Sequence, residues 1–265
     1  MIAKLYSREV KRNFKVLFAN WLPGSPIELG DYGIMRGDIF VPMGKLKNDF
    51  PEFAGDVIQL ELDPTSDHKE FKSGDGIEVR FSPRGSITAG GAPLAKASLE
   101  VAFSRENSVF FDAAECRTTR IANKARVGEI IKSLMAQDRW SRKFCVVTEV
   151  VQAGRTIIAI SSGRDSSISF EADSPAIQNI NLADAGIGFS VARERDIGYK
   201  LNAPNGLSIL IGLCKMKSPF LTPVKNFSPL ETLDTLSNGA EVAEEVDTEV
   251  SVDELTFGQL LETDL

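Results

Sequence analysis

The residue types that carry out most protein catalysis are scarce in this sequence. It contains one histidine, His68, and three cysteines, Cys116, Cys145 and Cys214. His68 lies in the charged stretch DPTSDHKEFKSGDG, which we interpret as a solvated loop. Nothing in the sequence brings it beside a cysteine or serine, as nucleophilic catalysis would require. We therefore expect a protein that is not an enzyme, with a hydrolase of unrecognised site as a minor alternative.

Metal and cofactor sites are not indicated either. Asp63, Asp67 and Asp75 lack the ligand spacing of a calcium-binding loop. The glycines of TAGGAP are not followed by the Lys-Ser/Thr pair of a phosphate-binding loop. The cysteines are scattered and odd in number, which is typical of reduced, small apolar residues in a cytosolic protein. We expect no cofactor and no metal.

Charge divides the chain into two parts. The net charge is −7, yet residues 218–265 contain eleven acidic residues and one lysine, a balance of −10, which leaves +3 for residues 1–217. The sequence therefore predicts a folded body over 1–217 and an acidic linker and tail over 218–265. Basic residues are not interleaved with aromatic residues as in a nucleic-acid site, so no nucleic-acid partner is expected.

The first element that we expect is a helix over residues 2–21, ended by Pro23-Gly24. Its apolar residues recur at helical spacing, and basic residues occupy the other side. This helix is either a surface helix with a solvated basic face or one that an anionic membrane surface attracts. No apolar run is long enough for a transmembrane helix, and the N-terminus lacks the features of a signal peptide.

Most of the remaining sequence predicts strands. Period-two alternation marks DVIQLELD, GIEVRFS, ASLEVAFS and SVFFDAAE, and GIGFSVARE and GLSILIGLCKM follow later. A second helix is expected over residues 123–140, with one apolar face: Val127, Ile130, Ile131, Leu134 and Met135. This order of elements predicts an α+β fold, a twisted and mainly antiparallel sheet with flanking helices.

The stretch FCVVTEVVQAGRTIIAIS, residues 144–161, allows two interpretations. A turn at Gln152–Arg155 would fold it into an ordinary hairpin. Without that turn it is one strand of about twice the usual length of 3–10 residues. The local pattern alone leaves both possibilities open.

The run from Arg126 to Gly163, a helix leading into VVTEVVQ, resembles the pore-forming domain of gasdermins, as does the later GIGFSVARERD. The length is also similar to that of bacterial gasdermins, although residues 1–115 lack the N-terminal cysteine that is palmitoylated there. The resemblance implies a long strand at 144–161. It also implies a pore-forming protein that is autoinhibited and cytoplasmic. Proteolytic removal of its C-terminal segment would allow it to bind anionic membranes. There it would form a ring oligomer with a β-barrel pore and cause lytic cell death, as in antiviral defence.

The resemblance also implies three sets of site residues. The lipid-binding residues would be Lys4, Arg8, Lys11, Arg12 and Lys15. The membrane-spanning hairpins would use Val79, Phe81, Val101, Phe103, Val147, Val151, Ile158 and Ile160. The inhibitory tail would dock through Phe257, Leu260 and Leu261. The expected partners are anionic lipids, an activating protease and further copies of the chain. The alternative is a non-enzymatic interaction protein whose acidic tail recruits a partner.

Overall fold

The structure is a computed structural model that describes residues 2–21, 26–82, 97–172, 190–191, 197–203, 207–217 and 226–230. Its chain divides into two compact units, Met1–Thr232 and Leu233–Leu265, of which the second lies outside the described residues. Strand β15 (Asn226–Pro229) pairs with β14 (Leu207–Lys217). The compact body therefore extends to Thr232, beyond the boundary at residue 217 that the composition predicts.

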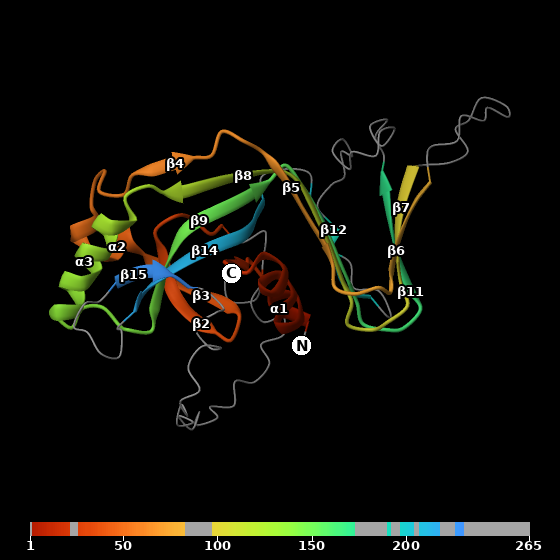
Figure 1. Cartoon of the computed structure of the whole chain (residues 1–265), viewed down its shortest axis with the longest axis horizontal. Helices are drawn as coiled ribbons and strands as arrows, with labels where there is room; N and C mark the ends of the chain where they lie inside the picture. The colour runs from red at the N-terminus through yellow and green to blue at the C-terminus, as the bar shows by residue number, and fades with distance from the viewer. Residues whose placement is uncertain are drawn as a thin grey trace, which may run out of the picture. The chain divides into compact units, whose positions relative to one another are not determined.

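The described strands of the first unit form two antiparallel sheets, which with helices α1 and α3 confirm the predicted α+β class. The larger sheet has the central order β1-β14-β9-β8-β10-β13-β12, and the smaller has the order β11-β7-β6. Figure 1 shows β14, β9 and β8 side by side in the larger sheet. The other elements up to β7 are α1 (Ile2–Phe14), β1 (Leu17–Ala19), β2 (Asp31–Arg36), β3 (Ile39–Lys45), α2 (Leu46–Asp49), a 3₁₀ turn (Pro51–Phe53), β4 (Leu60–Leu62), β5 (Asp67–Lys72), β6 (Ile77–Ser82) and β7 (Ala97–Phe103). They are followed by β8 (Val109–Ile121), α3 (Lys124–Ala136), β9 (Phe144–Ala153), β10 (Arg155–Ser161), β11 (Ser166–Ala172), β12 (Ser190–Val191) and β13 (Ile197–Ala203).

Strands β9 and β10 settle the question raised by residues 144–161. Both pair with the same strand, β8: Arg120 lies opposite Glu149 of β9, and Val109 lies opposite Ile160 of β10. The pairing keeps one register along the whole of β8. The stretch is thus one long, interrupted strand, and the hairpin interpretation is wrong.

The interruption lies at Gly154, opposite Glu115 of β8. Glu115 adopts a left-handed backbone conformation with φ of 53°, and the Gly154 amide donates to the carbonyl oxygens of both Ala114 and Glu115. A Cβ on Gly154 would lie 2.9 Å from the Glu115 Cβ. Glycine is therefore required where the two strands bend together.

The N-terminal helix is shorter than the sequence predicts. It ends at Phe14, Lys15 follows in the left-handed conformation with φ of 51°, and Leu17–Ala19 form β1, which pairs with β14. Residues 17–21 therefore do not continue the helix, and Pro23-Gly24 does not end it. Pairing with a distant strand outweighs the local helical spacing of Leu17 and Phe18.

Helix α3 forms where it is predicted, and all five of its predicted apolar residues are buried. They pack in a cluster with Leu46, Phe53 and Trp140. Gly128 brings the helix against β15, since a Cβ there would lie 2.5 Å from the Phe227 Cβ. Figure 1 shows α3 beside β15.

Two other predictions need correction or fall outside the described residues. Only Leu60–Leu62 of DVIQLELD form a strand, and both leucines are exposed. The predicted loop around His68 is strand β5, which pairs with β8. Of GIGFSVARE, only Ser190 and Val191 lie within the described residues.

Candidate functional site

Helix α1 presents an exposed basic face. Lys4, Arg8, Arg12 and Lys15 are all exposed. Lys11 is held within the body instead: its Nζ lies 3.0 Å from an Asp38 oxygen and 5.1 Å from the centre of the Phe18 ring. Four of the five predicted lipid-binding residues thus face solvent.

The opposite side of α1 anchors the helix to the larger sheet. Leu5, Tyr6 and Val10 are buried in one cluster with residues of β8, β10 and β14. Aromatic rings strengthen the contact, because the Phe14 ring lies 5.6 Å from the rings of both Phe71 and Phe111, edge-on to each. This packing holds the backbone of α1 in place, while Lys4, Arg8 and Arg12 remain exposed on its other side.

The three-stranded sheet β6–β7–β11 has one apolar face. Its rows of paired residues alternate, so that Val79, Val101 and Ile168 form one row and Ile77 and Phe103 belong to another. Val101 and Ile168 are 0% exposed and Phe103 is 1% exposed, and Val79 is half-buried. This face packs against Phe110 of β8 and against Ile157 and Ala159 of β10. For Phe81, only the strand register is described.

The intervening rows give the same sheet a polar face. Ala102 lies between Glu78 and Ser167 in one row, and Arg80 lies opposite Glu100 in the next. Glu78 and Arg80 are exposed and form an ion pair of 2.8 Å on this face. A hairpin with one apolar and one charged face is typical of strands that line a pore, with lipid on one side and water on the other.

The other four predicted membrane residues lie in the long strand. Val147, Val151, Ile158 and Ile160 are each 0% exposed. Ile158 packs toward Leu5 and Val10 of α1, whereas its neighbours Ile157 and Ala159 pack toward the smaller sheet. Both faces of β10 are therefore covered, which explains why its sequence does not alternate cleanly.

The single histidine is not in a solvated loop. His68 lies on β5, and its Nε2 is 3.0 Å from Oδ2 of the buried Asp112 on β8. Its side chain remains 50% exposed.

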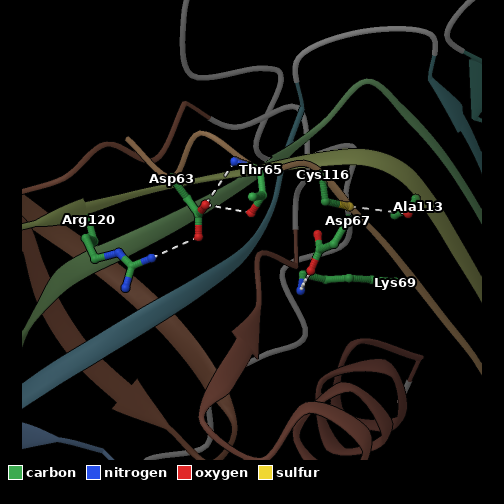
Figure 2. A network of polar contacts seen from close by, with 7 residues as sticks. All are labelled: Asp63, Thr65, Asp67, Lys69, Ala113, Cys116 and Arg120. Carbon is green, nitrogen blue, oxygen red and sulfur yellow. Dashed lines mark hydrogen bonds and ion pairs between the residues drawn. The ribbon is translucent and has the colours of Figure 1, made fainter. Parts of the chain in front are cut away.

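Polar contacts fix the corner between β4 and β5, immediately before His68. Figure 2 shows Asp63 accepting hydrogen bonds from the backbone and hydroxyl of Thr65 and pairing with Arg120 at 3.1 Å. The bonds from Thr65 and the charge of Arg120 lower the pKa of Asp63. On the other side of the corner, Lys69 pairs with Asp67 at 2.7 Å. The segment that joins β4 to β5 is therefore held to β8 by an ion pair as well as by backbone hydrogen bonds.

All three cysteines are free and buried. Burial raises the pKa of Cys116 and of Cys145 to about 11. The Cys116 thiol donates to the Ala113 carbonyl at 3.3 Å (Figure 2). Thiols that stay protonated are poor nucleophiles.

Comparison with known proteins finds similarity among solved structures only. No protein-family model matches the chain, and no curated protein matches it. Among solved structures, the chain is similar to a bacterial gasdermin from Bradyrhizobium tropiciagri, with 14% identity over 77% of this chain and 84% of that one and a TM-score of 0.32. At that TM-score, any functional conclusion must rest on the residues of this chain. None of the described helices combines the length and apolar character needed to cross a bilayer.

Sequence reasoning missed some residues of this site and left others untested. The polar residues Glu78, Arg80 and Glu100 could have been found from the strict alternation of GIEVRFS and ASLEVAFS. Asp112 had a weaker signal, a single carboxylate inside the apolar run VFFDAA. The predicted tail residues Phe257, Leu260 and Leu261 lie outside the described residues.

Proposed function

We propose that this chain is a pore-forming protein without enzymatic activity, in which the β6–β7 hairpin enters the bilayer and α1 binds anionic lipid headgroups. The observation that carries the proposal is the two-faced character of the smaller sheet, with apolar rows alternating with charged rows. Residues 77–103 comprise 27 positions, as the numbering gives. That length accommodates two spanning strands of about 9–11 residues each and a turn.

Burial energetics favour a membrane as the destination of this hairpin. A fully buried Val, Leu, Ile or Phe side chain contributes roughly 1.5–3 kcal/mol. Four apolar side chains of this hairpin are buried in the shared cluster: Ile77, Leu99, Val101 and Phe103. Exposing them to water would cost on the order of 10 kcal/mol. The hydrocarbon of a bilayer removes most of that cost, and a closed barrel satisfies the strand edges.

The charge of the chain supports a role for its C-terminal part as an inhibitor. Residues 233–265 contain ten acidic and no basic residues. We infer that this segment masks the basic face of α1 and repels anionic lipid, so that proteolysis between Leu230 and Glu245 frees the body. Phe257, Leu260 and Leu261 would supply apolar contacts, because charge alone is screened over about 8 Å at physiological salt. The chain would be cytoplasmic before cleavage. After cleavage, copies of the chain would form a membrane-bound ring. Such a pore would cause lytic cell death, as in antiviral defence.

A cleavable full-length chain tests the function. A specific protease site is inserted after Thr232, and dye release from vesicles with and without anionic lipid is measured before and after cleavage. We expect release only after cleavage and only from anionic vesicles, with rings visible by electron microscopy. A cleaved chain that stays monomeric and releases no dye would contradict the proposal. If the severed acidic segment then captured a partner, the interaction-protein alternative would be favoured.

The lipid-binding role of α1 has its own test. Each basic residue near an anionic surface contributes about 1 kcal/mol, so reversing Lys4, Arg8, Arg12 and Lys15 to Glu removes at least about 4 kcal/mol, or a thousandfold in vesicle affinity. The control reverses four basic residues on and after α3: Arg126, Lys132, Arg142 and Lys143. It changes the net charge equally, so equal losses in both variants would remove α1 from the mechanism.

A further inference from the structure

Three side chains that commonly bind metal ions meet where β5 pairs with β8. His68, Glu70 and Asp112 each offer a ligand atom, and these atoms all lie within 4.8 Å of one another. His68 and Glu70 are two residues apart on β5, and His68 lies where the register with β8 shifts, between Asp67 and Lys69. Glu70 lies directly opposite Asp112. Strand pairing, rather than a loop, fixes their spacing.

The three ligands differ in exposure. Asp112 is 3% exposed, whereas His68 and Glu70 are exposed. His68 Nε2 lies 3.0 Å from Oδ2 of the buried Asp112. A buried carboxylate is stable only with a partner of complementary character. One end of the cluster is thus anchored in the protein interior, while the other opens to solvent.

Two basic residues near the cluster have carboxylate partners of their own. Arg155 of β10, the basic group that acts on Asp112 after His68, directs one guanidinium nitrogen to Glu115 at 3.2 Å. Lys69 follows His68 on β5 but pairs with Asp67 instead. Among the described side chains, the groups that offer ligand atoms here are an imidazole and two carboxylates.

We propose that His68, Glu70 and Asp112 bind a divalent transition-metal ion, for which Zn²⁺ is the appropriate probe. Zinc accepts imidazole nitrogen at about 2.0–2.1 Å and carboxylate oxygen at about 2.0–2.2 Å. Ligand atoms in this cluster could reach those distances by small side-chain rotations, with water completing the coordination from the solvent side. A nitrogen ligand disfavours Mg²⁺ and Ca²⁺. The ion would clamp β5 onto β8, and the site is separate from the lipid-binding surface proposed above.

The full-length chain, stripped with a chelator, is titrated with ZnCl₂ by calorimetry in excess Mg²⁺, which occupies weak sites on the acidic segments. We expect one equivalent of tightly bound Zn²⁺ and a rise in unfolding temperature. Because His68 is the only histidine, its ring signals in an NMR spectrum report binding at this site, and no other histidine signals need to be assigned. Co²⁺ should give the visible absorption of a nitrogen–oxygen site.

The decisive variants are His68→Gln and Glu70→Gln. Each should weaken Zn²⁺ binding at least about tenfold, the loss that even an indirect partner of a metal ligand can cause. Glu61→Gln on β4 is the matched control, because Glu61 is also an exposed carboxylate on a strand paired with β8. Circular dichroism checks folding, and Glu70→Gln alone decides the matter if His68→Gln does not fold. The proposal is overturned if Zn²⁺ does not bind stoichiometrically, or if Glu61→Gln loses as much affinity as the ligand variants.

Discussion

The smaller sheet and the long strand β9–β10 are both rich in apolar residues, yet they are built for different surroundings. In the smaller sheet, apolar rows such as Val79–Val101–Ile168 alternate with polar rows such as Arg80–Glu100. In β10, Ile157 and Ile158 are both buried, on opposite faces. A strand that is apolar on both faces suits the interior of a protein. A strand with one apolar and one polar face suits a boundary between lipid and water.

This difference identifies the segment that could leave the body. Releasing the smaller sheet removes one layer from β8 and β10, and the rest of the larger sheet keeps its pairing. Releasing β9 would separate it from both β8 and β14 and would divide the core. We therefore expect the long strand to remain as the scaffold from which the hairpin opens.

The largest effect should come from truncating the long strand. Ile158 is fully buried beneath α1, so Ile158→Ala should lower the free energy of unfolding by about 2–5 kcal/mol through lost contacts and a cavity. Chemical denaturation monitored by circular dichroism measures it. A loss below about 1 kcal/mol, within the range of ordinary surface changes, would mean that β10 is not a core strand.

A charge on the hairpin should act in the membrane more than in the body. Val79 is half-buried on the apolar face, so Val79→Lys should reduce dye release by the cleaved chain about 30- to 1,000-fold, equivalent to the roughly 2–4 kcal/mol cost of Lys at mid-bilayer.

Ala102→Lys provides the matched comparison, since Ala102 is partly exposed in the adjacent polar row of the same hairpin. Dye release by this variant should stay near that of the unmodified chain. Equal inhibition by both lysines would mean that the two faces of the hairpin do not meet different environments.

The shared bend of β8 and β9–β10 should be sensitive to one methyl group. Gly154→Ala places a Cβ 2.9 Å from that of Glu115, and relieving that overlap should cost about 1–3 kcal/mol of stability. Thermal unfolding gives the value. Glu115→Gly in the same chain should recover part of it, because it removes the clashing side chain and tolerates the positive φ. No recovery would mean that the clash lies elsewhere.

The smallest expected effect concerns the thiol reactivity of the cysteines, which lie on β8, β9 and β14 and should react slowly both before and after cleavage. With a pKa of about 11 for Cys116 and Cys145, roughly one thiol in a thousand is ionised at pH 8. Labelling by a thiol reagent should therefore be slow, and faster only as the pH rises toward 11 or in denaturant. It should stay slow after cleavage in the presence of vesicles. Rapid labelling of Cys145 there would show that the long strand opens too.

Local patterns in the sequence predict elements whose partners are near in the chain. The spacing of Val127, Ile131 and Leu134 predicts α3, and the alternation of GIEVRFS and ASLEVAFS predicts β6 and β7. The errors arise where a distant partner decides the structure. Leu17 and Phe18 have helical spacing but pair with β14, and the turn-like QAGR continues as a strand because β8 lies along its whole length. Likewise, the site at His68 depends on Asp112, forty-four positions away.

The pairing of β1 with β14 also bears on the order in which the chain folds during its synthesis. Leu17 lies opposite Gly212, so these partners come from nearly opposite ends of the compact unit. Closing so long a loop is slow, whereas the β6–β7 hairpin needs only neighbouring residues and forms early. On the ribosome, β1 cannot be paired until Gly212 has emerged from the exit tunnel. The adjoining basic helix is therefore synthesised well before β14 and is among the last elements to be secured.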